Sequence, residues 1–265
     1  MNRLFEHRQQ ILNGLLVLFV FFIPVSTALT NVILGLVLLF WLLDNGPDRF
    51  AGWGRILKSN PVAVMGLVVF LMHVAGVAYT DGQTEKIIES LSDGARFLFI
   101  GMMMVYFTEG RGSSAVVLSF LSVMAGILFL SCLLWLDLLP TIIAVKGDAS
   151  NAVIFHDHIK HNSFMAFAAF AAGVKARQTG AGPVGRGLWA VFSLLALFNV
   201  LFMVAGRTGH VIAAVLGVYY FFTWDLKKSL AAGGAVLILL GAFAWFNPSN
   251  PLFLRAQTAI EEVRE

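Results

Sequence analysis

The chain has 265 residues, of which 58% are hydrophobic and only 12% are charged. Soluble globular domains carry about 25% charged residues, so this composition excludes a disordered protein, a secreted disulfide-rich scaffold and an ordinary cytosolic enzyme. Cys132 is the single cysteine, which rules out a disulfide framework, and a net charge of +3 is too small to indicate nucleic-acid binding. Long apolar runs separated by short polar segments predict an all-α, polytopic transmembrane helix bundle.

The apolar runs, taken in chain order, predict the number of spans. The first run, from Ile11 to Leu43, would be about 50 Å long as one helix, which is too long for a bilayer core of about 30 Å. Pro24 and neighbouring polar residues interrupt it, so it predicts two helices, 11–28 and 31–43, joined by a tight turn. We expect about nine spans in a transmembrane domain, 1–246, followed by the start of a periplasmic loop at 247–265. The seven later spans are predicted at 62–80, 95–108, 114–138, 162–174, 187–205, 210–224 and 229–246.

The placement of the charged residues predicts the orientation of the spans. With the N-terminus inside, every inside segment is basic and the outside segment 81–93 is acidic. This is the pattern of the positive-inside rule, so we expect a cytoplasmic N-terminus and a periplasmic C-terminus. The basic residues of the inside segments are Arg3, Arg8, Arg49, Arg55, Lys58, Arg111, Lys175, Arg177, Arg186, Lys227 and Lys228.

A short polar turn, Gly206-Arg207-Thr208-Gly209, separates two apolar runs at the predicted outer face. An arginine at that depth usually lines a cavity or pathway, and its planar guanidinium binds phosphate through two parallel hydrogen bonds. The two glycines allow a tight turn and a close approach of the backbone. Together these residues favour a site for an anionic, lipid-linked substrate. The alternative is an interfacial arginine that extends its charge to the lipid headgroups.

A second polar cluster, His156-Asp157-His158-Ile159-Lys160-His161-Asn162, precedes the span at 162. Three histidines and an aspartate suggest a metal site, but on a helix His156 and His161 would point about 140° apart, so we expect no metal there. We expect instead a polar lining of an outer cavity, in which Lys160 and the histidines contact phosphate or sugar. The alternative is a solvated start of a helix.

Lys86 and Arg96 are the cations of the acidic outer segment, and Arg96 falls where the next span begins. Either side chain could face a phosphate group. The alternative for Lys86 is an exposed ion pair with a neighbour such as Glu89, which would contribute little to stability.

Two further features favour helix packing rather than chemistry. His73 and Asn199 lie inside apolar runs, where polar side chains often bridge helices by hydrogen bonds. The alanine-rich stretch Met165–Ala171 indicates close packing of one helix against its neighbours.

Four stretches together resemble the O-antigen ligase family, a polytopic superfamily of lipopolysaccharide O-antigen ligases, O-antigen polymerases and pilin O-oligosaccharyltransferases. The GRTG turn is the most specific element, and Arg207 matches one arginine of the family. The resemblance implies a multi-pass protein of the bacterial inner membrane. The four stretches are FFIPVSTALTNVILGL (21–36), FHDHIKHNSFMAFAAF (155–170), NVLFMVAGRTGHVIAA (199–214) and NPLFLRAQTAIEEV (250–263).

The resemblance implies a glycosyltransferase that moves a glycan from undecaprenyl diphosphate to a sugar of the lipid A core, or to another glycan acceptor, on the periplasmic side. It implies no cofactor and no metal. Periplasmic arginines would hold the diphosphate, and a histidine on a large loop would be the catalytic base. That loop is expected beyond Glu265, which favours an N-terminal fragment unless His156, His158 or His161 serves as the base. The residues expected at the diphosphate are Arg207, Lys160, Arg96 and Lys86, with Gly206, Thr208 and Gly209 supporting the turn.

Several other functions stay open at this point. An O-antigen polymerase or a protein O-oligosaccharyltransferase would use the same donor with a different acceptor. A membrane transporter would show internal repeats and helices broken at the midplane, whereas no repeat is visible and the polar residues cluster towards the outer face. A non-catalytic assembly partner is a further alternative.

Overall fold

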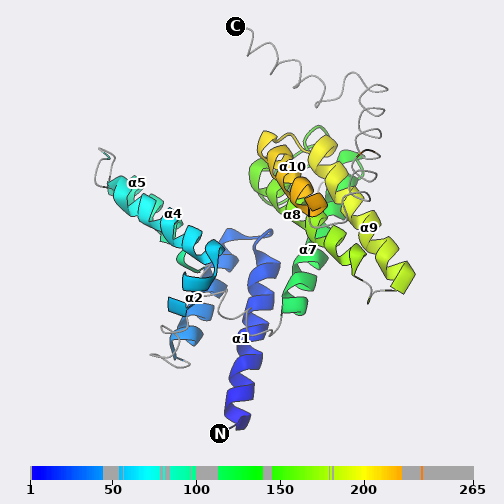
Figure 1. Ribbon diagram of the computed structural model, residues 1–265. Helices are drawn as coiled ribbons and strands as arrows, with labels where there is room; N and C mark the ends of the chain where they lie inside the picture. The colour runs from blue at the N-terminus through cyan, green and yellow to red at the C-terminus, as the bar shows by residue number, and fades with distance from the viewer. Residues whose placement is uncertain are drawn as a thin grey trace. The chain divides into compact units, whose positions relative to one another are not determined.

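The computed structural model (Figure 1) describes residues 2–43, 54–55, 57–77, 80, 84–95, 97–99, 113–139, 145–178, 180, 182–222 and 234. Every regular element among these residues is a helix, so the predicted all-α class is confirmed for the described part of the chain. The chain divides into two compact units. One comprises residues 1–18 and 31–116, and the other comprises residues 19–30 and 117–265.

The turn between the first two helices lies earlier than predicted. α1 (Asn2–Phe22) ends four residues before Ser26, and α2 (Thr27–Leu43) begins directly after it. Pro24 has no N–H and disfavours a helical conformation at the preceding residue, so the helix stops there. Ser26 then caps α2, because its hydroxyl accepts a hydrogen bond from Leu29 N at 3.4 Å. Pro24 and the Ser26 cap therefore place the helix boundary at 22–27, whereas the polar residues further along the chain predicted it at 28–31.

The first unit contains a pair of packed helices, α4 (Pro61–Val77) and α5 (Thr84–Ala95). Asn60 caps α4 by accepting a hydrogen bond from Val62 N at 2.9 Å. The segment expected as an acidic loop is instead largely the helix α5. Its Ile87 and Leu91 are partly buried at helical spacing while Thr84, Lys86 and Ser90 are exposed, a pattern that the charge count concealed.

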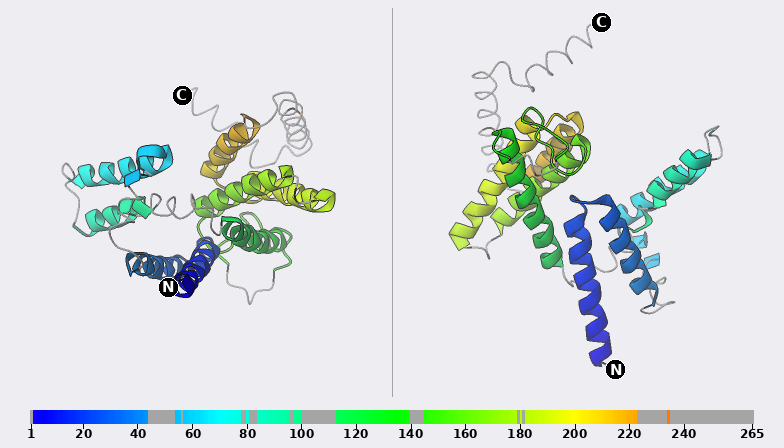
Figure 2. Two further views of the ribbon diagram at one scale, coloured as in Figure 1. Left: turned by 60° about the horizontal axis from the view of Figure 1, so that its bottom comes forward. Right: turned by 180° about the vertical axis from the view of Figure 1, so that it is seen from behind.

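The second unit contains α7 (Ser113–Trp135), α8 (His158–Arg177), α9 (Gly182–Phe198), the short π-helix η2 (Asn199–Met203) and α10 (Arg207–Phe222). α8 packs against both α9 and α10 (Figure 2). The predicted close packing of Met165–Ala171 is confirmed, since Met165, Ala168 and Ala172 are fully buried. Small side chains on α8 let its neighbours approach, as in membrane helix bundles.

Two described helices are long and apolar enough to cross a membrane, Ser114–Trp135 and Gly182–Met203. Four shorter apolar helices occur at Gln10–Phe22, Thr27–Phe40, Pro61–Val77 and Thr208–Phe221. This criterion rests on length and composition only, and 39% and 22% of the tested 18-residue windows of these two helices are buried. The predicted spans at 95–108 and 229–246, and the segment 247–265, lie almost wholly outside the described residues.

Large apolar side chains are exposed along several helices. Val184 and Leu188 on α9 are 78% and 67% exposed, and Met72 on α4 is 66% exposed. α10 exposes Val211, Val215 and Val218 in the same way. The last three are spaced by four and three positions, so they lie on one side of α10.

Candidate functional site

The buried polar side chains of the described residues gather at one end of the second unit. They are Ser131, His156, His161, Asn162 and Asn199. They come from α7, α8, η2 and the loop 145–157 that precedes α8. Because buried polar groups must be hydrogen-bonded to be tolerated, their partners define how these elements meet.

Three of these side chains form one hydrogen-bonded chain. Ser131 donates its hydroxyl to Ala152 O at 2.5 Å, and Asn199 Nδ2 donates to Ser131 Oγ at 2.7 Å. The Asn199 amide thus presents its oxygen to His161, whose Nε2 lies 3.1 Å away and donates to it. The network therefore assigns the proton of His161 to Nε2. Asn199 bridges helices as predicted, while His73 bonds Val69 O on its own helix at 2.8 Å.

The helical path is broken between α9 and α10. η2 closes with a bond from Val204 N to Asn199 O, and Val204 then turns to an extended conformation before α10 begins. Residues of the 145–157 loop bind the backbone groups at this break. Ala152 N donates to Met203 O, and Asn151 Oδ1 accepts from Ala205 N, both at 2.9 Å. A break inside a helical unit is tolerated when neighbours satisfy its backbone in this way.

The GRTG turn packs directly on Asn162 of α8. A Cβ at Gly206 would lie 2.7 Å from Asn162 Nδ2, and a Cβ at Gly209 would lie 2.9 Å from Asn162 Cγ. Neither glycine has a positive φ, so both are needed for space and not for an unusual backbone conformation. Asn162 Nδ2 donates to Val204 O and Gly206 O at 3.4 Å, while its buried Oδ1 accepts no hydrogen bond within the described residues.

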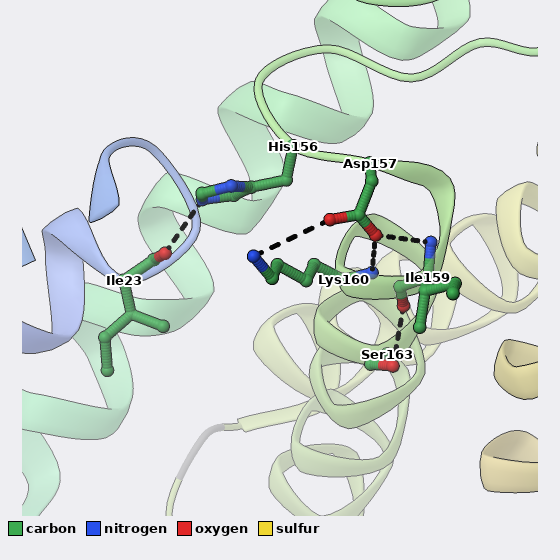
Figure 3. Close-up of polar contacts among 6 residues, drawn as sticks. All are labelled: Ile23, His156, Asp157, Ile159, Lys160 and Ser163. Carbon is green, nitrogen blue, oxygen red and sulfur yellow. Dashed lines mark hydrogen bonds and ion pairs between the residues drawn. The ribbon is translucent and has the colours of Figure 1, made fainter. Parts of the chain in front are cut away.

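The first turn of α8 is capped by Asp157 (Figure 3). Its Oδ1 accepts from Ile159 N and Lys160 N at 3.0 Å, and its Oδ2 lies 3.7 Å from Lys160 Nζ. Burial raises the pKa of Asp157, but the hydrogen bond from Lys160 N and the Lys160 charge outweigh it and hold that pKa below its ordinary value. The carboxylate is therefore ionised at neutral pH, and its weak ion pair leaves the Lys160 ammonium exposed to solvent.

His156 fastens the loop to the turn between α1 and α2. Its Nε2 donates to Ile23 O at 3.1 Å (Figure 3), and its ring packs edge-on against the ring of Phe164. Burial lowers the pKa of His156, the bond to Ile23 opposes that shift, and the positive charges of Lys160 and Lys146 lower the pKa further. The imidazole is thus neutral at physiological pH and acts as a tether. The charges of Lys160 and Lys146 both act on the His156 ring.

The structure separates the three candidate histidines by environment. His156 and His161 are buried and donate to a carbonyl and to an amide oxygen, respectively. His158, the first residue of α8, is exposed. No group of three or more histidine, cysteine, aspartate or glutamate side chains with the spacing of a metal site occurs in the described part of the chain.

The first turns of α8 and α10 meet at this junction, because Asn162 lies against Gly206 and Gly209. This places Lys160, Thr208 and the backbone of Arg207 at one end of the unit. The side chain of Arg207 and the whole of Arg96 lie outside the described atoms. Lys86 belongs to α5 of the other unit, where its side chain is exposed.

The pairing of these elements could not be anticipated from the chain alone. Asn162 was part of the polar cluster, but nothing in its neighbourhood indicated that it would contact residues more than 40 positions away. Ser131 is a lone hydroxyl in an apolar run, and such residues commonly bond their own helix. No family model, curated protein or solved structure matches this chain.

Proposed function

We propose that this chain is the donor-binding membrane part of a glycosyltransferase of the O-antigen ligase type. In this proposal the chain crosses a bacterial inner membrane about nine times, with a cytoplasmic N-terminus and the α8–α10 junction on the periplasmic side. The donor is a glycan on undecaprenyl diphosphate, and the acceptor is a lipid A core sugar. A polymerase or a protein glycosyltransferase would use the same donor site.

The meeting of the first turns of α8 and α10 is the observation that carries the proposal. The N-terminus of a helix presents unbonded N–H groups and the positive end of the helix dipole, which together favour anions. Asp157 already accepts from Ile159 N and Lys160 N at the start of α8, so in this proposal the start of α10 faces the anion, with Lys160 on the adjoining first turn of α8.

The chemistry of the transfer agrees with such a site. The diphosphate is already a good leaving group, so the protein needs mainly to position it and stabilise the charge that develops on it. A histidine with a free acceptor nitrogen would remove the proton of the acceptor hydroxyl. Of the three histidines, His158 fits that role best because it alone is exposed.

The exposed apolar residues of α4, α9 and α10 support the membrane location. The basic residues at the helix ends of the second unit also agree with α8 and α9 crossing the membrane in opposite directions. Lys175 and Arg177 end α8 and Arg186 lies near the start of α9, at the end of the hairpin that the charge pattern assigns to the cytoplasm.

Arg207 tests the proposal most directly. In cells that lack their own ligase and accumulate lipid-linked O-antigen, we expect both Arg207→Ala and Arg207→Lys to reduce ligation about tenfold or more. The lysine variant should fail because a point charge cannot reproduce two parallel hydrogen bonds. Lys58→Ala, which removes an exposed cation elsewhere, is the control. Normal lipopolysaccharide ladders from the lysine variant would contradict the assigned role.

A further inference from the structure

Three cations gather at the end of the second unit that lies opposite the α8–α10 junction. Lys175 and Arg177 are in the last turn of α8, and Arg186 is near the start of α9. Arg186 Nε donates to Ala176 O at 3.2 Å, so its guanidinium lies across the hairpin beside the residue between the other two cations. The connection between α8 and α9 therefore brings these three cationic residues to the same end of the helical hairpin.

Two of the three charged side chains donate to backbone carbonyls. Among the described residues 158–222 the sequence has no aspartate or glutamate, and Asp157 lies at the other end of α8, about 27 Å from Lys175 at 1.5 Å per residue. The bond to Ala176 O uses one of the five N–H groups of Arg186. The Arg177 guanidinium lies 5.0 Å from the centre of the Tyr220 ring and donates to Tyr220 O at 3.4 Å.

Aromatic and apolar side chains adjoin the three cations. Tyr220 donates its hydroxyl to Gly173 O at 3.2 Å and contacts Phe170, which also contacts Tyr219. Tyr219 is 59% exposed and Val184, at the start of α9, is 78% exposed. Tyrosines with one apolar and one polar end are typical of the boundary between bilayer core and headgroups.

We propose that Lys175, Arg177 and Arg186 form a binding site for the headgroup phosphate of an anionic phospholipid, whose acyl chains lie along the exposed apolar residues of α9 and α10. Clustered cations at the cytoplasmic ends of membrane helices bind such headgroups. A nearby apolar surface favours an amphiphile over a free phosphate. This site rests on the membrane placement in the proposed function but is independent of the donor site. The length of α8 between the two sites matches a hydrocarbon core of about 30 Å.

The test compares lipid retention in nanodiscs made from equal amounts of phosphatidylglycerol and phosphatidylcholine. The chain is purified from them in mild detergent, and the retained lipids are counted by mass spectrometry. We expect the unmodified chain to retain phosphatidylglycerol preferentially. The double variant Lys175→Gln/Arg186→Gln, which keeps the Arg177–Tyr220 contact, should lower that preference about tenfold. Arg55→Gln/Lys58→Gln removes the same charge from exposed positions of the other unit and should lower it less than twofold.

The remaining outcomes decide against the site. Equal retention of the two lipids by the unmodified chain, or an unchanged preference in Lys175→Gln/Arg186→Gln, would overturn it. Inorganic phosphate that stabilises the chain in pure phosphatidylcholine discs as much as phosphatidylglycerol does would assign the cations to a soluble anion instead. Recovery of the chain from the soluble fraction would remove the membrane placement and this site with it. Equal retention of the two lipids by an unmodified chain that still binds undecaprenyl diphosphate would overturn this site alone.

Discussion

Gly206 and Gly209 lack the Cβ atom that would overlap the Asn162 side chain of α8. The two glycines let the start of α10 lie against Asn162, and through it against the first turn of α8. The sequence predicted a close approach of the backbone at these glycines, and the structure confirms it. It could not predict which residue they approach, because that contact is set by the packing of helices and not by the local chain.

Gly209→Ala should destabilise the protein by about 1–3 kcal/mol, because its Cβ would overlap the Asn162 side chain in a packed interior. Gly217→Ala is the matched control on the same helix. A Cβ there meets nothing within 4 Å, and alanine favours the helix, so this variant should be neutral or slightly stabilising. Unfolding in mixed micelles measures both variants. Equal stabilities for the two would place the GRTG turn away from Asn162.

His156 should make stability depend on pH in a defined direction. Its pKa is below the ordinary value of 6.5 in the folded protein, so the unfolded chain binds a proton first as the pH falls. The stabilisation is therefore complete above pH 6.5 and decreases as the pH falls below it. His156→Gln should have a flatter stability profile between pH 7 and pH 5, measured by thermal unfolding. A profile as steep as that of the unmodified protein would assign the pH dependence to other groups.

At the scale of elements, the apolar runs predicted where helices occur better than they predicted the residues at which those helices begin and end. The predicted spans at 62–80, 114–138 and 210–224 agree with α4, α7 and α10 to within a few residues. The turn after α1 was predicted but placed too late, and the helix α5 was missed, because Pro24 with the Ser26 cap at the turn and an amphipathic pattern in α5 outweigh composition. The π-helix at Asn199 has no local signature, since its bonds depend on Ser131 and His161 from other helices.

Asn199 holds the broken helix in contact with two neighbours. Asn199→Ala should cost about 1–2 kcal/mol, because it leaves Ser131 and His161 without their buried partner. Ser193→Ala removes a single bond to Ala169 O and should cost less than about 1 kcal/mol. Chemical unfolding of the two variants compares them. A larger effect from Ser193→Ala would mean that the network contributes little.

At the scale of the whole molecule, the charge pattern makes a prediction that labelling can check. In a Cys132→Ser background, Ser90→Cys and Ser150→Cys should react with an impermeant maleimide from the periplasm, because their segments are outside in the predicted topology. Gln178→Cys should react only after the membrane is opened. All three positions are exposed, so access and not burial decides the result. The reverse pattern would invert the orientation and move the donor site to the cytoplasm.

The contacts between the 145–157 loop and the α9–α10 break have a mechanical consequence. Ala152 N binds Met203 O and Ala205 N binds Asn151 Oδ1, so neither segment can separate from the other without losing both bonds. The two segments therefore open as one cooperative unit. A molecule that binds the 145–157 loop would therefore also restrict the motion of the start of α10, although the two segments are some 50 residues apart in the chain.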